Sequence, residues 1–351
     1  MIPLENIYYL LCYAWNRLEE KELINVSTLE VPDLPNLLAK VLLKGMKVLI
    51  NRGLEKQYIA EQNHYQGIKG RVDFNYSFRK NLFQQGLAMC EFDELSVNIL
   101  PNQILKTSLQ NVVKLPTLDR KLKRDIQSVL YQLIAIDVIE IRNDTFSNIQ
   151  IHRNNFYYLF LLNICELLYQ NLSIHEKTGE VKFKDFLRDE RQMARLFEEF
   201  IRNFYKIEVP EAKVFREDLH WQFTGEQMQF LPKMQTDISI KLPSNRKIII
   251  DAKYYAETLQ HFYDSEKIHS RNLYQMFAYL KNQPNQQAEG ILLYPTVQKS
   301  LSLTYTYEEH RIRVETLNLN QPWTEIKRDL LLILDRKNDE LETRSTKIIQ
   351  N

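Results

Sequence analysis

The sequence predicts two domains, an α+β domain over residues 1–175 and an α/β domain over residues 176–351. Its length of 351 residues is itself typical of about two domains. Apolar residues recur at helical spacing through most of the first half, except in a β-rich segment at about residues 54–95. In the second half, two apolar strands, a helix and a further strand follow one another between residues 234 and 295. Polar residues and Gly179 mark the boundary near residues 172–179.

The first domain begins with two predicted helices. Residues 4–20 place their apolar side chains on one helical face, and residues 34–52 do the same after Asp33, a typical capping residue. Gly53 is expected to end the second helix. Residues 97–115, 121–136 and 153–172 return to helical spacing, so we expect a largely helical domain.

The segment at residues 54–95 changes to a strand-like pattern. The side chains that indicate short strands are Tyr58, Ile59, Tyr65, Val72, Phe74, Tyr76 and Phe78. Among them lies the tight basic loop Gly67–Arg71, which carries Lys69 and Arg71. The residues alone leave two interpretations open, a plain β-turn and a projecting finger that contacts a partner.

The second domain begins with an amphipathic helix at residues 189–206. Glu198 and Glu199 flank its apolar stripe symmetrically, so each is either a solvated side chain or a carboxylate of a functional site. A later helix, residues 272–281, carries Gln275 and Tyr279 one turn apart on one side. Residues 290–295 are then expected to form a buried strand.

A predicted hairpin between these helices carries the most informative residues of the chain. Its strands are residues 234–241 and 248–253, and the turn-forming residues 243–245 connect them. If Ser244 is the apex, residues whose numbers sum to 488 face each other, and Asp237 then faces Asp251. Lys253 lies two residues beyond Asp251 and therefore shares its face.

Two opposed carboxylates in a hairpin indicate a bound cation. Side chains directly opposite each other have Cβ atoms about 5 Å apart, and like charges there are unfavourable unless a cation binds between them. Carboxylate oxygens suit Mg²⁺, which can activate water for phosphodiester hydrolysis, and a lysine can orient that water or the phosphate. The alternative is an ordinary solvated strand end. Asp237 with Asp251–Lys253 resembles the PD-(D/E)xK nuclease motif, and the Gln275-x-x-x-Tyr279 spacing resembles its RecB-type branch.

Composition excludes several other classes of protein. The net charge is +1, from 46 basic and 45 acidic side chains, so any DNA contact must come from a local patch. Three scattered cysteines argue against a zinc site and predict a cytoplasmic protein. The longest apolar run, residues 156–169, is shorter than the about 20 residues of a membrane span. The sequence contains no phosphate-binding loop motif, so we do not expect this chain to bind a nucleotide itself.

Five segments together resemble the McrC family, the nuclease subunits of 5-methylcytosine restriction systems. These segments are Ile2–Trp15, Gly67–Phe74, Thr236–Ile238, Asp251–Tyr255 and His269–Gln275. They occur in the same order as in the family and span nearly the whole chain. The resemblance implies a Mg²⁺-dependent endonuclease that cuts double-stranded DNA containing modified cytosine, as in defence against phage.

The resemblance also implies a partner and a division of labour. The partner would be a hexameric AAA+ GTPase of the McrB type, which binds the GTP. The first domain and its finger would engage this ring and stimulate GTP hydrolysis, with Lys69 and Arg71 at the contact.

In the second domain, the resemblance implies that Asp237, Asp251 and the backbone carbonyl of Ala252 bind the metal. It implies that Lys253 is the catalytic lysine and that Gln275 lies in the site. Glu198 matches a helix carboxylate that would be a further metal ligand.

Two other functions remain open from the sequence. One is a stand-alone PD-(D/E)xK nuclease of repair or transposition, which would cut DNA without GTP or a partner. The other is a catalytically idle adaptor that only stimulates an AAA+ motor. The sequence leaves open the target base, the flanking sequence and the stoichiometry of the complex.

Overall fold

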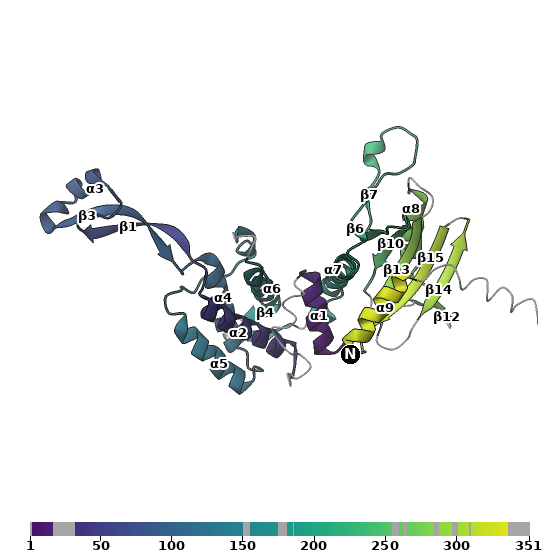
Figure 1. The fold of residues 1–351 in the computed structure, drawn as a ribbon, viewed down its shortest axis with the longest axis horizontal. Helices are drawn as coiled ribbons and strands as arrows, with labels where there is room; N and C mark the ends of the chain where they lie inside the picture. The colour runs from purple at the N-terminus through teal and green to yellow at the C-terminus, as the bar shows by residue number, and fades with distance from the viewer. Residues whose placement is uncertain are drawn as a thin grey trace, which may run out of the picture. The chain divides into compact units, whose positions relative to one another are not determined.

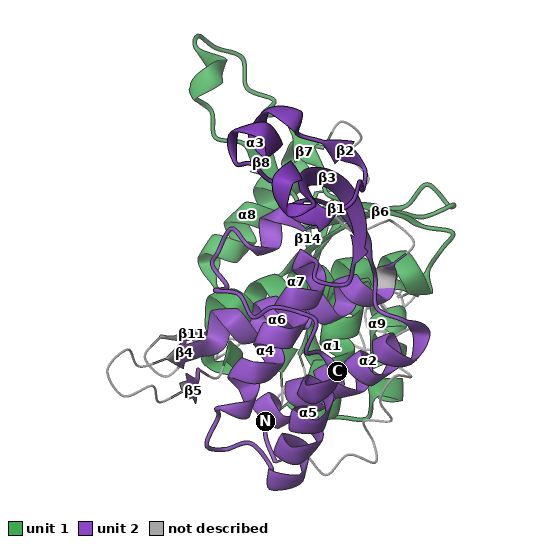
Figure 2. Ribbon diagram, turned by 90° about the vertical axis from the view of Figure 1, so that its left-hand side faces the viewer, with its two compact units in different colours: residues 1–29, 185–351 green, residues 30–184 purple. Residues whose placement is uncertain are grey.

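The structure is a computed structural model that describes residues 2–16, 32–149, 155–174, 181–184, 186–254, 260–262, 265–283, 288–296, 301–308 and 310–335. It forms two compact units (Figure 2). Unit 1 consists of Met1–Leu29 and Asp185–Asn351, and unit 2 consists of Glu30–Lys184. We expected domains of residues 1–175 and 176–351. The structure differs from this expectation because the N-terminal segment belongs to the same compact unit as the C-terminal part of the chain.

Helix α1 (Leu4–Ala14) explains this difference, because it packs within unit 1. The Tyr13 hydroxyl donates to Glu208 Oε1 at 2.5 Å, and Asn203 Nδ2 donates to the carbonyl of Ala14 at 2.8 Å. Both partners lie on α7 (Glu190–Glu208). Asn6 Nδ2 donates to the carbonyl of Leu319 at 2.9 Å. The helix was expected over residues 4–20; it ends at Ala14, and residues 17–20 lie outside the described part of the chain.

Unit 2 contains four longer helices, close to the predicted ranges: α2 (Leu34–Arg52), α4 (Leu100–Val113), α5 (Arg120–Gln132) and α6 (Phe156–Asn171). Asp33 caps α2 as predicted, because its side chain accepts a hydrogen bond from the backbone N–H of Asn36 at 3.0 Å. The helices bury a shared apolar core that includes Leu37, Leu105 and Leu161. Strands β4 (Leu172–Ile174) and β5 (Val181–Phe183) form a small ribbon at the end of the unit.

The finger is a three-stranded antiparallel sheet in the order β1-β3-β2. Strands β1 (Gln57–Gln66) and β3 (Leu87–Ser96) form a long ribbon, and β2 (Arg71–Val72) pairs with β3. Figure 1 shows this ribbon extending away from the helices of its own unit. The expectation of strand structure at residues 74–78 is wrong, because these residues form helix α3 (Phe74–Arg79). The reason is local: the Asp73 side chain accepts from the backbone N–H of Tyr76 at 2.9 Å and starts a helix.

Unit 1 contains a six-stranded mixed sheet in the order β14-β15-β13-β10-β9-β6. Its strands are β6 (Lys213–Phe215), β9 (Ile238–Lys241), β10 (Lys247–Ala252), β13 (Ala288–Thr296), β14 (Ser302–Tyr307) and β15 (His310–Asn318). Strands β10, β13 and β15 are parallel to one another, whereas β9 is antiparallel to both β10 and β6. The carboxyl end of β10 and the beginning of β9 therefore lie at the same end of the sheet.

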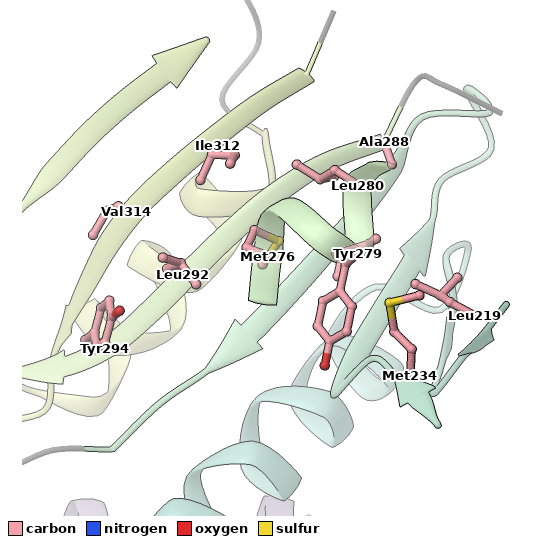
Figure 3. Close-up of a cluster of buried hydrophobic side chains, with 11 residues drawn as sticks. Leu219, Met234, Met276, Tyr279, Leu280, Ala288, Leu292, Tyr294, Ile312 and Val314 are labelled. Atoms are coloured by element: carbon pink, nitrogen blue, oxygen red, sulfur yellow. The ribbon is translucent and has the colours of Figure 1, made fainter. Parts of the chain in front are cut away.

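Helices cover both faces of this sheet. On one face, Met276 and Leu280 of α8 (Ser270–Lys281) pack against Leu292 and Val314 (Figure 3). Helix α8 lies so close that a Cβ atom on Gly290 would be 2.5 Å from Met276 Sδ. On the other face lie α7 and α9 (Trp323–Asp335), joined by the Tyr205 hydroxyl, which donates to the carbonyl of Leu330 at 2.8 Å. Within the described ranges, no helix has the length and apolar character that crossing a membrane requires.

Gly70 in the finger offers a test of this fold. Its φ is +66°, and an added Cβ would lie 2.3 Å from the carbonyl oxygen of Glu91 on β3. Gly70→Ala should therefore destabilise the finger by about 1–3 kcal/mol, because both the backbone conformation and the space require glycine. Hydrogen exchange of the β1 and β3 amides measures this change. Gly225→Ala is the matched control, with open space around the site, and equal protection in the two variants would contradict the structure of the loop.

Candidate active site

The β9–β10 hairpin confirms the predicted register. Its Cα pairs run from Lys247 with Lys241 to Ile250 with Ile238, so paired numbers sum to 488. The turn is closed by a hydrogen bond from the backbone N–H of Leu242 to the carbonyl of Arg246 at 3.0 Å. Asp251 lies in β10, and Asp237 directly precedes β9. Continuing the register by one residue places these two carboxylates opposite each other.

The structure brings Asp237, Asp251 and Lys253 together. Lys253 Nζ lies 2.9 Å from Asp251 Oδ1 and 3.7 Å from Asp237 Oδ2. The side chain of Asp251 is fully buried, whereas those of Asp237 and Lys253 retain about a fifth of their exposure. Lys253 is fixed by its backbone N–H, which donates to the carbonyl of Leu293 on β13 at 3.0 Å. The three groups therefore form a cluster in which only Asp237 and Lys253 are accessible to solvent.

The electrostatics of the cluster follow from burial and proximity. Burial and the neighbouring Asp251 carboxylate raise the pKa of Asp237 to about 7, although Lys253 and Arg216 oppose this shift. Burial alone would lower the pKa of Lys253, but the two carboxylates outweigh it and the pKa is raised. Lys253 is therefore an ammonium group at neutral pH.

The buried Asp251 carboxylate fits a metal ligand. Its only neighbours for a hydrogen bond among the described residues are Lys253 and the Asp237 carboxyl, which binds it only when protonated, and no backbone N–H or neutral side chain donates to it. A buried carboxylate without such partners is costly, and a divalent cation would satisfy it. Over the same residues, no group of three or more His, Cys, Asp or Glu side chains could hold a metal. Two carboxylates would therefore need a backbone oxygen or water to complete a site. Ala252 is buried beside Asp251, and its carbonyl as a ligand stays a prediction.

The carboxylates on α7 are occupied by arginines. Glu198 Oε1 pairs with Arg202 at 3.0 Å and also with Arg216, and Glu199 pairs with Arg202. The role of Glu198 as a metal ligand stays a prediction, because in this structure its charge is balanced by two guanidinium groups. Arg216 is a residue that the sequence analysis missed. It pairs with Glu198, its pKa is raised chiefly by that hydrogen bond, and the charge of Asp237 contributes to the same shift. An isolated arginine outside any periodic pattern gave no signal.

Gln275 and Tyr279 lie beside the cluster. Gln275 Nε2 donates to the Tyr279 hydroxyl at 2.6 Å, and that hydroxyl donates to the carbonyl of Gln235 at 2.7 Å. The pKa of Tyr279 is raised to about 12, mainly by burial, and both Asp251 and Asp237 contribute. The sequence predicted only that Tyr279 lies one turn from Gln275, and the structure buries Tyr279 in the core. Gln275 and Tyr279 therefore fix the strand that leads into Asp237.

The predicted contact residues of the finger lie in unit 2. Lys69 Nζ sits 3.7 Å from the ring centre of Phe92 and 3.2 Å from Glu94 Oε2. Lys69 is thus partly engaged by its own sheet, which the sequence did not indicate. Arg71 is exposed on β2, opposite Glu91.

Comparison with known proteins places the chain in a family. A family model described as McrBC 5-methylcytosine restriction system component matches residues 5–295. The type IV methyl-directed restriction enzyme EcoKMcrBC of Escherichia coli K12 is 33% identical over 341 residues, which cover 95% of this chain and 98% of that protein. A chain from the Thermococcus gammatolerans assembly of McrB AAA+ hexamers with bound McrC has a similar fold, with a TM-score of 0.61 and 17% identity over 94% of this chain and 76% of the other. The chain belongs to the McrBC 5-methylcytosine restriction system component family.

Proposed function

We propose that this chain is the endonuclease subunit of a GTP-dependent restriction complex that cuts double-stranded DNA containing modified cytosine. The juxtaposition of Asp237, Asp251 and Lys253 at the end of one sheet carries this proposal. Its reaction class is Mg²⁺-dependent phosphodiester hydrolysis by a PD-(D/E)xK-type site. The family and the restriction role of the E. coli relative support the substrate class.

The protein's own groups have separable tasks in this reaction. Asp251 and Asp237 would hold Mg²⁺, together with the carbonyl of Ala252. The ion supplies neutralisation of the negative charge on the phosphate and acidification of a bound water. Lys253 keeps its proton at neutral pH and donates hydrogen bonds toward the phosphate or the attacking water. Its contacts with both carboxylates hold it at that position in advance.

Unit 2 would bind the partner and stimulate its GTPase. Its finger presents exposed side chains on a ribbon that stands apart from the helical core of the unit (Figure 1). The chain itself contains no phosphate-binding loop motif, so GTP binding falls to another protein. A McrB-type AAA+ GTPase hexamer is that partner by analogy with the T. gammatolerans assembly. The proposal therefore separates DNA cutting in unit 1 from GTPase stimulation by unit 2.

Substitutions in the carboxylate–lysine cluster should remove DNA cleavage and leave stimulation of the partner GTPase intact. Asp251→Ala should abolish cleavage, because it removes a metal ligand. Lys253→Ala should leave at most a trace, since loss of one preorganised charge lowers rates by about 10²–10³-fold. Both variants should still raise GTP turnover of the AAA+ partner to near the wild-type level. Plasmid linearisation and phosphate release, measured in one reaction with Mg²⁺, report both activities.

Glu308→Ala is the matched control, because Glu308 is an exposed carboxylate of unit 1 that pairs with Lys281. It should cut DNA like the wild type. Cleavage that survives Asp251→Ala would show that the active site lies elsewhere. A parallel loss of both activities in a folded variant would refute the division between the units.

The finger can be tested by removing its two cations. Lys69→Ala/Arg71→Ala should weaken stimulation of the partner GTPase, because both charges lie on the proposed contact. Exposed ion pairs contribute little, so the free energy of unfolding should change by less than about 1 kcal/mol. Lys121→Ala/Arg124→Ala on α5 removes the same charge from the same unit as a control. Equal stimulation by both double variants would exclude a role for the basic loop.

Tyr279→Phe tests whether the Tyr279 hydroxyl positions the strand that leads into Asp237. The change removes one hydroxyl and leaves the Gln235 carbonyl and Gln275 without their partner. We expect a loss of about 1 kcal/mol in unfolding free energy, together with lower cleavage at unchanged GTPase stimulation. The control is Tyr274→Phe, because Tyr274 is 71% exposed on the same helix. Full cleavage by Tyr279→Phe would show that the hydroxyl does not position the site.

A further inference from the structure

The loop between β7 (Asp218–Leu219) and β8 (Met234–Gln235) exposes large apolar side chains to an unusual degree. Phe223 is 59% exposed, Phe230 is 77% exposed, and Met228 in the short helix η6 (Met228–Phe230) is 39% exposed. Figure 1 shows the loop extending beyond β7, away from the sheet of its own unit. Scattered single apolar residues need no explanation, but three on one loop of fourteen residues indicate a contact surface.

The base of this loop is anchored, so the exposed side chains have a fixed support. Trp221 Nε1 donates to the carbonyl of Pro232 at 2.7 Å across the base. The backbone N–H of Gln222 donates to Asn282 Oδ1 at 2.8 Å, which ties the loop to the end of α8. The Phe223 ring stacks on Trp221 with ring centres 5.2 Å apart. The loop is therefore a built projection and not a loose connection.

The loop belongs to the same end of the sheet as the carboxylates. Strand β8 ends at Gln235, only two residues before Asp237. The backbone N–H of Thr236 donates to the carbonyl of Glu217 at 2.9 Å, which holds the ribbon at the beginning of β9. Tyr279 binds the carbonyl of Gln235 at the same place. If the phosphate of a substrate lay at Asp237, the neighbouring part of that substrate would therefore be close to this loop.

The chemistry of the loop suits nucleic acid bases. Between residues 220 and 233 it carries a single carboxylate, Glu226, and three uncharged amides at Gln222, Gln227 and Gln229. Proteins that contact the minor groove combine glutamine or asparagine with apolar wedges such as Phe and Met, which insert between base steps. Aromatic side chains also stack on unpaired bases. The phosphate backbone would be contacted by the cations nearby, among them Arg216 and Lys233.

We propose that the loop of residues 220–233 is a DNA-contacting element that places Phe223, Met228 and Phe230 against the bases beside the scissile phosphate. This inference rests on the proposed nuclease function and adds the surface that holds the duplex at the site. The partner is double-stranded DNA, because the loop is continuous with the carboxylate cluster of the same unit.

Photo-cross-linking identifies what the loop touches. A p-benzoylphenylalanine residue is placed at position 230, or at control position 305 on β14, the opposite edge strand of the sheet. The full complex is assembled with the AAA+ partner, a non-hydrolysable GTP analogue and a labelled methylated duplex, and then irradiated. We expect a cross-link to the DNA from position 230 and none from position 305. A cross-link from position 230 to the partner protein, or to neither, would overturn the proposal.

Substitution then measures the contribution of the loop. Phe223→Ala/Phe230→Ala should lower plasmid cleavage about tenfold or more, since stacking on a base contributes about 1–3 kcal/mol. GTPase stimulation should stay at the wild-type level, and the melting temperature should fall only slightly, because both side chains are exposed and the main packing lost is the stacking of Phe223 on Trp221. The control Tyr305→Ala should leave all three unchanged. Wild-type cleavage by the double variant would refute the loop proposal.

The two proposals fail in distinguishable ways. If the wild-type complex cuts methylated DNA, Asp251→Ala does not, and the loop variant cuts normally, only the loop proposal is wrong. If the wild-type complex with Mg²⁺, GTP and partner does not cut any DNA, the nuclease function itself is wrong.

Discussion

Two carboxylates and one ammonium group lie together where β9 begins and β10 ends, and one of them, Asp251, is completely buried. Folding must bury the Asp251 charge completely, with Lys253 as its nearest protein partner. A buried charge of this kind is tolerated only where its surroundings are fixed, because relaxation would let water in or let the charge separate from its partner. The hairpin register, the parallel contact with β13 and the helix α8 supply this rigidity. A buried, strongly interacting group of charges of this kind is what the proposed active site requires.

The juxtaposition of Asp237, Asp251 and Lys253 was predictable because the three residues lie close together in the sequence. The two strands and their turn lie within twenty residues, and a side-chain period of two leaves few registers that bury the three isoleucines of β10. Arg216 and the contacts of Glu198 could not be predicted, since they depend on where α7 meets a strand far along the chain. The helix at residues 74–79 was missed because its aromatic residues favour strands, whereas one capping aspartate decided the structure. The place of α1 depends on contacts to residues about 190–310 positions away.

The opposite face of the sheet contains a second buried charge network that no hydrophobic pattern would indicate. Arg313 is almost fully buried, pairs with Glu289 at 2.5 Å and with Glu315 at 3.2 Å, and donates to the carbonyl of Ile333 at 2.7 Å. Arg246 donates to the carbonyl of Leu334 at 3.0 Å. Two arginines thus satisfy the last carbonyls of α9, where positive charge also complements the helix dipole. Charged residues alternate with apolar residues in β15, and one of them, Arg313, together with Arg246 binds the last turn of α9.

The discontinuity of unit 1 has a consequence for how the protein is made. A ribosome releases residues 30–184 as one uninterrupted piece, so unit 2 can acquire its core while the remainder is still being synthesised. Helix α1 precedes unit 2 in the chain, but its partners Asn203 on α7 and Leu319 follow unit 2, so its buried face can be covered only after they have been synthesised. Unit 1 begins before unit 2 in the chain and continues after it, so its core can be completed only once unit 2 has been synthesised.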